Sequence, residues 1–146
     1  MVLSTRREAR LPTPAGWLRR DRRRRRKGAQ RIGHTPSPLE IVVVNTSAGA
    51  KFGQADYVNS SCGMGHEATM YLLERDVRMT GSDGWSWDAP FVYTAKKYAE
   101  TRDAGLIWEG HKAGRHIGYC HLEKLHNLDQ LPPACLLYTS PSPRDS

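Results

Sequence analysis

The sequence has few cysteines and lacks the long apolar run that a membrane-spanning helix requires. Its 146 residues include three cysteines, Cys62, Cys120 and Cys135, and no CxxC pair, so neither a disulfide framework nor a zinc knuckle is expected. No stretch approaches the roughly 18–20 apolar residues of a bilayer span. A secretory signal is also not expected, because arginines and prolines interrupt the first 18 residues. These absences predict a cytoplasmic protein with no membrane partner.

Acidic residues are scarce at the N-terminus, and this scarcity accounts for the whole net charge of +7. Residues 1–32 contain 12 Lys and Arg but only two acidic residues, whereas residues 33–146 contain 10 basic and 13 acidic residues. The arm is dense in charge and has no hydrophobic periodicity, so we expect it to be disordered. A mitochondrial presequence would share its arginine content, but five consecutive arginines without an apolar face argue against one. The mildly acidic remainder of the chain is therefore a better guide to function than the total charge.

Strand and helix patterns alternate through residues 33–134, which we interpret as a folded domain or part of one. The β-branched run at 41–44 predicts a buried strand, and shorter strands are expected at 77–80 and 106–108. Helical spacing predicts helices at 63–76 and 91–100. This alternation predicts an α/β fold with polar loops at the ends of its strands. Residues 135–146 continue no pattern and form a separate tail.

Two groups of residues could carry chemistry in this domain. His111 is expected in a glycine-bounded loop, 109–114, directly after the strand at 106–108, and Glu123 follows twelve residues later. Imidazole and carboxylate together suit zinc, manganese or ferrous iron. The segment 83–90 contains two indoles, Trp85 and Trp87, and two carboxylates, Asp83 and Asp88. It reads equally well as a buried turn or as an aromatic wall for a planar substrate.

Three segments closely resemble the cyclase family of metal-dependent hydrolases, which includes kynurenine formamidases (arylformamidases) and isatin hydrolases. They are VRMTGSDGWSWDAPF at 77–91, IWEGHKAGR at 107–115 and YCHLEKLHNLDQLPP at 119–133. The resemblance covers roughly residues 31–134 and implies a partial α/β hydrolase domain. The HxGTHxDxPxH motif of the family is absent, and Gly33-His34-Thr35-Pro36 is its only upstream candidate. The tail CLLYTSPSPRD resembles translated sequencing-adaptor sequence, so the chain is expected to be a fragment with foreign ends.

The resemblance implies a metal-dependent hydrolase that cleaves a C–N amide bond of a small molecule, as in tryptophan catabolism through kynurenine. It assigns His111 and Glu123 as ligands of a divalent metal (zinc, manganese or iron), with Glu123 also sharing proton handling. Trp85 and Trp87 would line the substrate pocket, and Asp83 and Asp88 would support the site or hold its turn. Family members are expected to form at least a dimer. Two ligands are fewer than a catalytic metal usually has, so we expect this chain to bind metal weakly and to lack formamidase activity.

The sequence is also compatible with two other functions. The arginine-rich arm could neutralise phosphates in a nucleic-acid-binding protein, but it lacks the interleaved aromatic rings or recognition helix that specificity needs. The domain could also be a noncatalytic α/β scaffold in which His111 and Glu123 are incidental.

Overall fold

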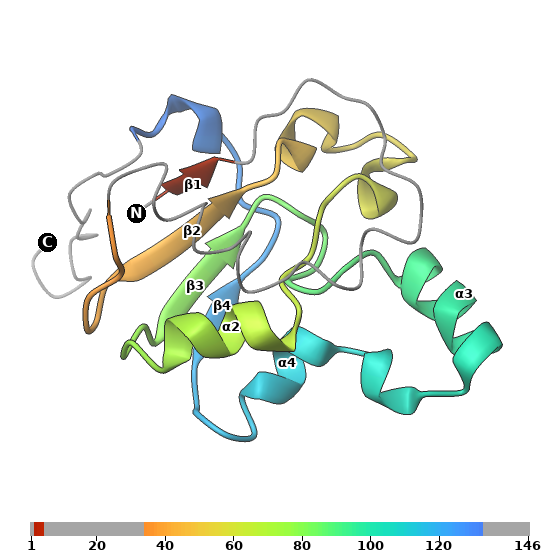
Figure 1. Cartoon of the computed structure of the whole chain (residues 1–146). Coiled ribbons are helices and arrows are strands. Elements are labelled where there is room, and N and C mark those ends of the chain that lie inside the picture. Colours follow the sequence, from red (N-terminus) through yellow and green to blue (C-terminus); the bar gives the residue numbers. More distant parts are fainter. Residues whose placement is uncertain (1, 5–33, 133–146) are drawn as a thin grey trace, which may run out of the picture.

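The computed structural model describes residues 2–4 and 34–132 (Figure 1). The predictions for the remainder of the N-terminal arm and for the tail from residue 135 lie outside these ranges. Within them the chain forms a parallel sheet with helices, which confirms the α/β class that the alternating pattern predicted. None of the helices in the described ranges is long and apolar enough to cross a membrane.

All four strands of the sheet are parallel and follow the chain in the spatial order β1-β2-β3-β4. Their bounds are β1 (Val2–Ser4), β2 (Ile41–Asn45), β3 (Met79–Ser82) and β4 (Cys120–Leu122). The β-branched side chains of β2 favour the extended backbone, as expected. By contrast, β1 lies within the arm that the sequence predicted to be disordered. The dipeptide Val2-Leu3, which precedes the first arginine, has the propensity for this short edge strand.

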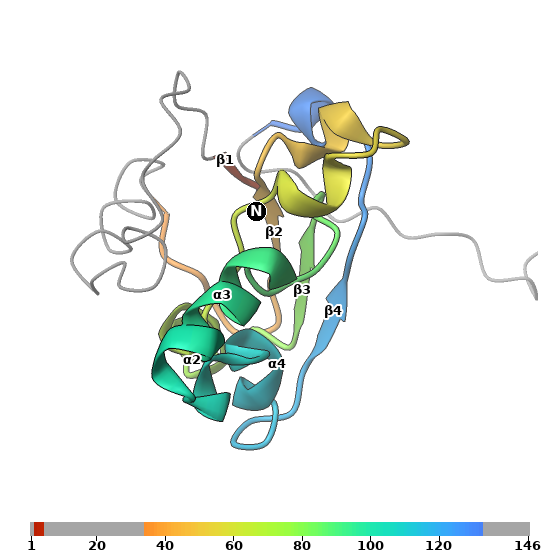
Figure 2. The same cartoon turned by 90° about the vertical axis from the view of Figure 1, so that its right-hand side faces the viewer.

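The helices are α2 (His66–Leu73), α3 (Phe91–Thr101) and α4 (Glu109–Ala113). Helices α2 and α4 pack against each other and lie on one side of the sheet, whereas α3 extends away from it (Figures 1 and 2). α2 connects β2 to β3, and both α3 and α4 lie in the connection from β3 to β4. The apolar core forms between the sheet and α2, from Val42, Val44, Leu72, Val77 and Trp87.

The register of the sheet determines which side chains face the helices. Val42 pairs with Thr80, and Thr80 pairs with His121, so these three residues form one row across the sheet. Because side chains alternate along a strand, the row shares the helix-covered side with the core. Met79 and Leu122 point to the opposite side, where 39% and 48% of their surfaces are exposed. The sheet therefore has one packed face, and His121 lies on it.

The structure contradicts two predictions for the segment that carries His111. The strand expected at 106–108 is absent; a short 3-10 helix, Ala104–Leu106, takes its place, and Trp108 adopts a left-handed conformation with φ of 55°. The loop expected at 109–114 is helix α4. Side-chain caps explain both differences: Asp103 accepts the amide N–H of Gly105 at 2.8 Å, and Asp88 accepts that of Gly110 at 2.6 Å. The second cap comes from 22 residues away and leaves no local pattern.

Candidate metal centre

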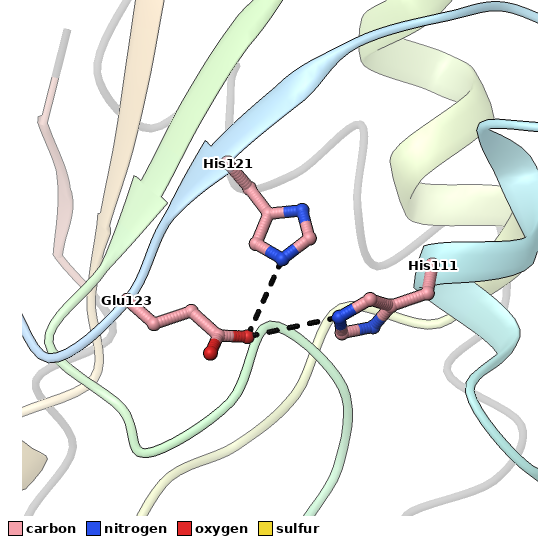
Figure 3. Close-up of side chains that lie close together, drawn as sticks. All are labelled: His111, His121 and Glu123. Atoms are coloured by element: carbon pink, nitrogen blue, oxygen red, sulfur yellow. Dashed lines mark ion pairs between the residues drawn. The ribbon is translucent and has the colours of Figure 1, made fainter.

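Three side chains that can ligate a metal ion meet at the end of the sheet: His111, His121 and Glu123, which we call the His–His–Glu cluster. Each offers one ligand atom, and these atoms lie within 4.8 Å of one another. Figure 3 shows the side chain of His111 extending from α4 and that of His121 from β4, while Glu123 directly follows the end of β4. Parallel α/β sheets usually place their ligands at the carboxyl ends of strands, and this cluster lies at such an end.

Strand β4 explains why His121 and Glu123 act together. Side chains two residues apart on an extended backbone point to the same side, so the sequence His-Leu-Glu presents both groups toward α4. The sequence pattern indicates Glu123 but not His121, because it predicts no strand at 120–122. An alternating His-x-Glu pattern was the one local signal that could have indicated the pair.

The two imidazoles converge on a single carboxylate oxygen. Oε1 of Glu123 lies 3.4 Å from Nε2 of His121 and 3.9 Å from Nε2 of His111. The same oxygen accepts the backbone N–H of Trp87 at 2.7 Å. This hydrogen bond holds the carboxylate in its orientation through a residue of the apolar core. All three members of the cluster are partly buried, so solvent screens their interactions less than it would on the surface.

Asp88 lies directly behind His111 and is buried. Its carboxylate accepts the backbone N–H groups of Gly110 and His111, and it also pairs with Nδ1 of the His111 ring. A carboxylate can only accept a hydrogen bond, so the proton of the neutral ring lies on Nδ1. Nε2 is then left with its lone pair directed to the cluster. In metal sites, carboxylates that accept the other ring N–H of a ligating histidine orient the imidazole in this way.

Asp83 has a different role from Asp88 in the structure. It accepts the backbone N–H and the hydroxyl of Thr46, both at 2.7 Å, and the N–H of Gly49 at 3.0 Å. Its carbonyl oxygen accepts the hydroxyl of Tyr57 at 2.8 Å. Asp83 therefore holds the turn after β2, which is one of the two roles considered for it.

The two tryptophans predicted to line a pocket occupy contrasting positions. Trp87 is only 1% exposed, and its indole N–H donates to the hydroxyl of Thr69 at 3.0 Å. Its ring stacks on His121 with centroids 6.2 Å apart, so it supports the cluster from the core. Trp85 is 48% exposed and packs against Tyr57 and the ammonium group of Lys124. The pocket role of both residues stays a prediction.

A third tryptophan, which no sequence pattern indicated, lies beside the cluster. The ring of Trp108 is 5.9 Å from that of His111, and 59% of the residue is exposed. Its left-handed backbone is rare for so bulky a side chain. This conformation begins helix α4 and places an aromatic surface next to His111.

The surroundings of His121 favour its neutral form. Burial lowers the pKa of His121, the neighbouring His111 lowers it further, and the carboxylates of Glu123 and Asp88 act in the opposite direction. A neutral imidazole is the form that binds metal. Burial also raises the pKa of the Tyr119 phenol, as do the charges of Asp88 and Glu123. The Tyr119 hydroxyl donates to the carbonyl of Gly110 at 2.9 Å and so holds α4 against β4.

The donor set of the cluster suits a divalent metal ion. Two imidazole nitrogens and one carboxylate oxygen are ligands for zinc, manganese or ferrous iron. The donor atoms come from two adjacent elements, α4 and the end of β4, which further contacts hold in place. The geometry of the cluster is thus suited to a cation, and the assignment of His111 and Glu123 as ligands stays a prediction.

Comparisons with known proteins identify one matching family model and solved structures with a similar fold. Residues 18–89 match a family model described as putative cyclase, and a search of curated proteins found no match. The crystal structure of an isatin hydrolase bound to the product analogue thioisatinate superposes with a TM-score of 0.55, at 23% identity, over 73% of this chain and 40% of that one. Isatin hydrolase A from Ralstonia solanacearum gives a TM-score of 0.53, at 26% identity, over 74% and 40%.

These matches cover different parts of the site. The family match includes Asp83, Trp85, Trp87 and Asp88 but ends before the His–His–Glu cluster. The structural likeness extends over about three quarters of this chain, which spans about 40% of the length of the two isatin hydrolases. The chain therefore matches the family model over residues 18–89 and has a fold similar to that of these proteins.

Proposed function

We propose that this chain is a cyclase-family protein and forms part of a metal-dependent hydrolase that cleaves a C–N amide bond of a small molecule. The observation that carries this proposal is the convergence of His111 and Glu123, 12 residues apart in sequence, with Nε2 and Oε1 separated by 3.9 Å. The family resemblance pairs the same two residues as ligands from the sequence alone. The likeness to isatin hydrolases supports the same class of reaction.

The residues around the cluster would prepare it for catalysis. When bound, a divalent cation polarises a carbonyl group and makes water nucleophilic near neutral pH. Asp88 keeps the proton of His111 on Nδ1, and the N–H of Trp87 holds Oε1 of Glu123 in place. Glu123 has a second carboxylate oxygen, Oε2, which lies 3.6 Å from the ammonium group of Lys124. This second oxygen is the atom we propose for accepting a proton from the attacking water.

The proposed substrate is a small aromatic amide of the arylformamidase or isatin hydrolase type. The exposed indole of Trp108, next to His111, is a surface on which a planar ring could stack. Trp85 remains the second candidate for this contact. Arylformamides and isatin-type cyclic amides have the amide nitrogen bonded to an aromatic ring, so the scissile C–N bond lies next to that ring, which suits a metal site beside an aromatic surface.

The deciding experiment measures hydrolysis of N-formylkynurenine and of isatin in the presence of zinc or manganese. It uses this chain and a version extended by the coding sequence on both sides in its gene. The HxGTHxDxPxH motif is absent here, so we expect this chain to bind metal with little or no turnover. The extended version should hydrolyse at least one of the two amides.

Variants of the extended version then test the site. His111→Asn and Glu123→Gln should each lower kcat/KM by about 100-fold or more, which corresponds to about 2.7 kcal/mol of lost transition-state stabilisation. His126→Asn is the matched control, because His126 is an exposed residue of the same segment. The proposal is wrong if the metal-loaded extended version hydrolyses neither amide, or if both site variants retain full activity.

A further inference from the structure

His121 could have one of three roles in the His–His–Glu cluster. It could be a packed residue of the protein interior, a hydrogen-bond donor that orients Glu123, or a metal ligand in its own right. The three roles predict different distances and different orientations of the ring, so the geometry can distinguish them.

The distances argue against a hydrogen-bonding role. An N–H···O hydrogen bond in proteins spans about 2.7–3.2 Å, and Nε2 of His121 lies 3.4 Å from Oε1 of Glu123. That oxygen already accepts the backbone N–H of Trp87 at 2.7 Å. The Trp87 amide is thus the group that orients the carboxylate. His121 is not needed for this purpose.

The same distances suit atoms that share a cation. Metal–nitrogen and metal–oxygen bonds of about 2.0–2.2 Å at tetrahedral angles place neighbouring ligand atoms about 3.4 Å apart. The His121–Glu123 separation of 3.4 Å equals this value, and the His111–Glu123 separation of 3.9 Å exceeds it by half an ångström. All three donor atoms lie within 4.8 Å of one another.

The orientation of the His121 ring argues against a simple packing role. Aromatic neighbours surround it: the Trp87 indole stacks on one face, the Tyr119 ring lies 5.6 Å away, and the His111 ring meets it edge to face at 4.5 Å. Its Nε2 edge points to the carboxylate of Glu123 and to the Nε2 edge of His111, as Figure 3 shows. The aromatic contacts fix the ring so that its polar edge meets the other two donors.

We propose that His121 is the third protein ligand of this metal centre, through Nε2, together with Nε2 of His111 and Oε1 of Glu123. The inference rests on the metal dependence in the proposed function, but it does not depend on the substrate. Two of the three ligands would then come from one His-x-Glu pair at the end of β4. Three protein ligands leave a coordination position open for substrate or water, as catalytic sites require.

The test counts imidazole ligands directly in the full chain. Zinc binding is measured by equilibrium dialysis, and the chain is then loaded with Cu²⁺ as a paramagnetic probe whose nitrogen couplings report the number of bound imidazoles. The wild-type chain should bind about one equivalent of zinc and show two imidazoles. His121→Phe, which keeps a ring to stack on Trp87, should show one imidazole and bind zinc at least about tenfold more weakly.

Two further variants keep the result interpretable. His126→Asn removes an exposed imidazole from the same segment and should bind metal as the wild type does. His121→Asn serves as a second substitution if the Phe variant does not fold, and circular dichroism checks the fold of each. Unchanged zinc affinity with two coupled imidazoles in a folded His121 variant would overturn this inference and leave the proposed function intact. Less than about 0.1 equivalent of zinc in the wild type would also overturn it, whereas the proposed function fails only on the hydrolysis assays of the extended version.

Discussion

Asp88 joins His111 to the rest of the fold through three contacts: the backbone N–H groups of Gly110 and His111 and the Nδ1 atom of the His111 ring. One buried carboxylate therefore starts helix α4 and sets the proton position of the His111 imidazole. Trp87, the residue before it, donates its backbone N–H to Glu123 and stacks on His121. The two adjacent residues Trp87 and Asp88 thus contact all three members of the His–His–Glu cluster.

The first prediction concerns Asp88. Asp88→Asn replaces an acceptor-only group with an amide whose NH₂ would face at least one of the three donors. We expect zinc or manganese affinity to fall about 10–100-fold, the usual effect of losing a carboxylate that orients a ligating histidine. Asp103→Asn is the matched control, because Asp103 caps a short helix at 104–106 that contributes no member to the cluster. Competition titration against a chelating dye measures both, and equal affinities of Asp88→Asn and wild type would contradict the prediction.

The second prediction compares two buried threonines, each 0% exposed. The hydroxyl of Thr69 accepts the indole N–H of Trp87 and donates to the carbonyl of Gly65, whereas that of Thr80 has no hydrogen-bond partner within the described ranges. Thr69→Val should lower the free energy of unfolding by about 1–3 kcal/mol, because it leaves a buried indole N–H unpaired. Thr80→Val should be neutral or stabilising. Urea denaturation measures both, and an equal loss in the two variants would contradict this reasoning.

The third prediction concerns the close approach of Gly63 to the segment that carries Asp88. A Cβ atom at Gly63 would lie 1.8 Å from the backbone N of Ala89 and 2.0 Å from the carbonyl carbon of Asp88. Gly63→Ala must displace one of the two backbones, so we expect it to cost at least about 1–3 kcal/mol of stability. Gly118→Ala is the control, since a Cβ there meets no atom within 4 Å. Thermal unfolding should separate the two, and similar midpoints would show that the approach is looser than described.

The fourth prediction concerns pH. Burial raises the pKa of the Tyr57 phenol, as do the charges of Asp83 and Glu123, so the folded state favours the neutral form. The stability that this gives is fully present below about pH 10, the pKa of an unperturbed tyrosine. It is lost as pH rises from there through the higher pKa of the folded state.

Tyr57→Phe tests this directly. The variant loses the hydrogen bond to the Asp83 carbonyl and should be about 1 kcal/mol less stable at neutral pH. Its stability should also fall less steeply than that of the wild type above pH 10. Denaturation curves at pH 8–11 give both quantities, and parallel pH dependences of the two proteins would refute the shift.

The sequence by itself determined the features that depend on local pattern. The β-branched run from Ile41 predicted strand β2, and Pro90 followed by helical spacing predicted α3 at its observed start. The alternation of these elements predicted the α/β class. Resemblance to the family motifs pairs His111 with Glu123. Such a match needs only the residue types and their order along the chain, so it can be made without the fold.

Only the tertiary structure decided how His111 is presented and that His121 accompanies it. Helix α4 forms where a loop was expected because Asp88, distant in sequence, caps its first N–H groups. Strand β4 is short and offers few side chains for a period-2 pattern, and pairing with β3 defines it. That pairing brings His121 to the helix-covered side of the sheet. Such contacts join residues far apart in the chain. They contribute to stability only in the folded protein, so no local sequence pattern indicates them.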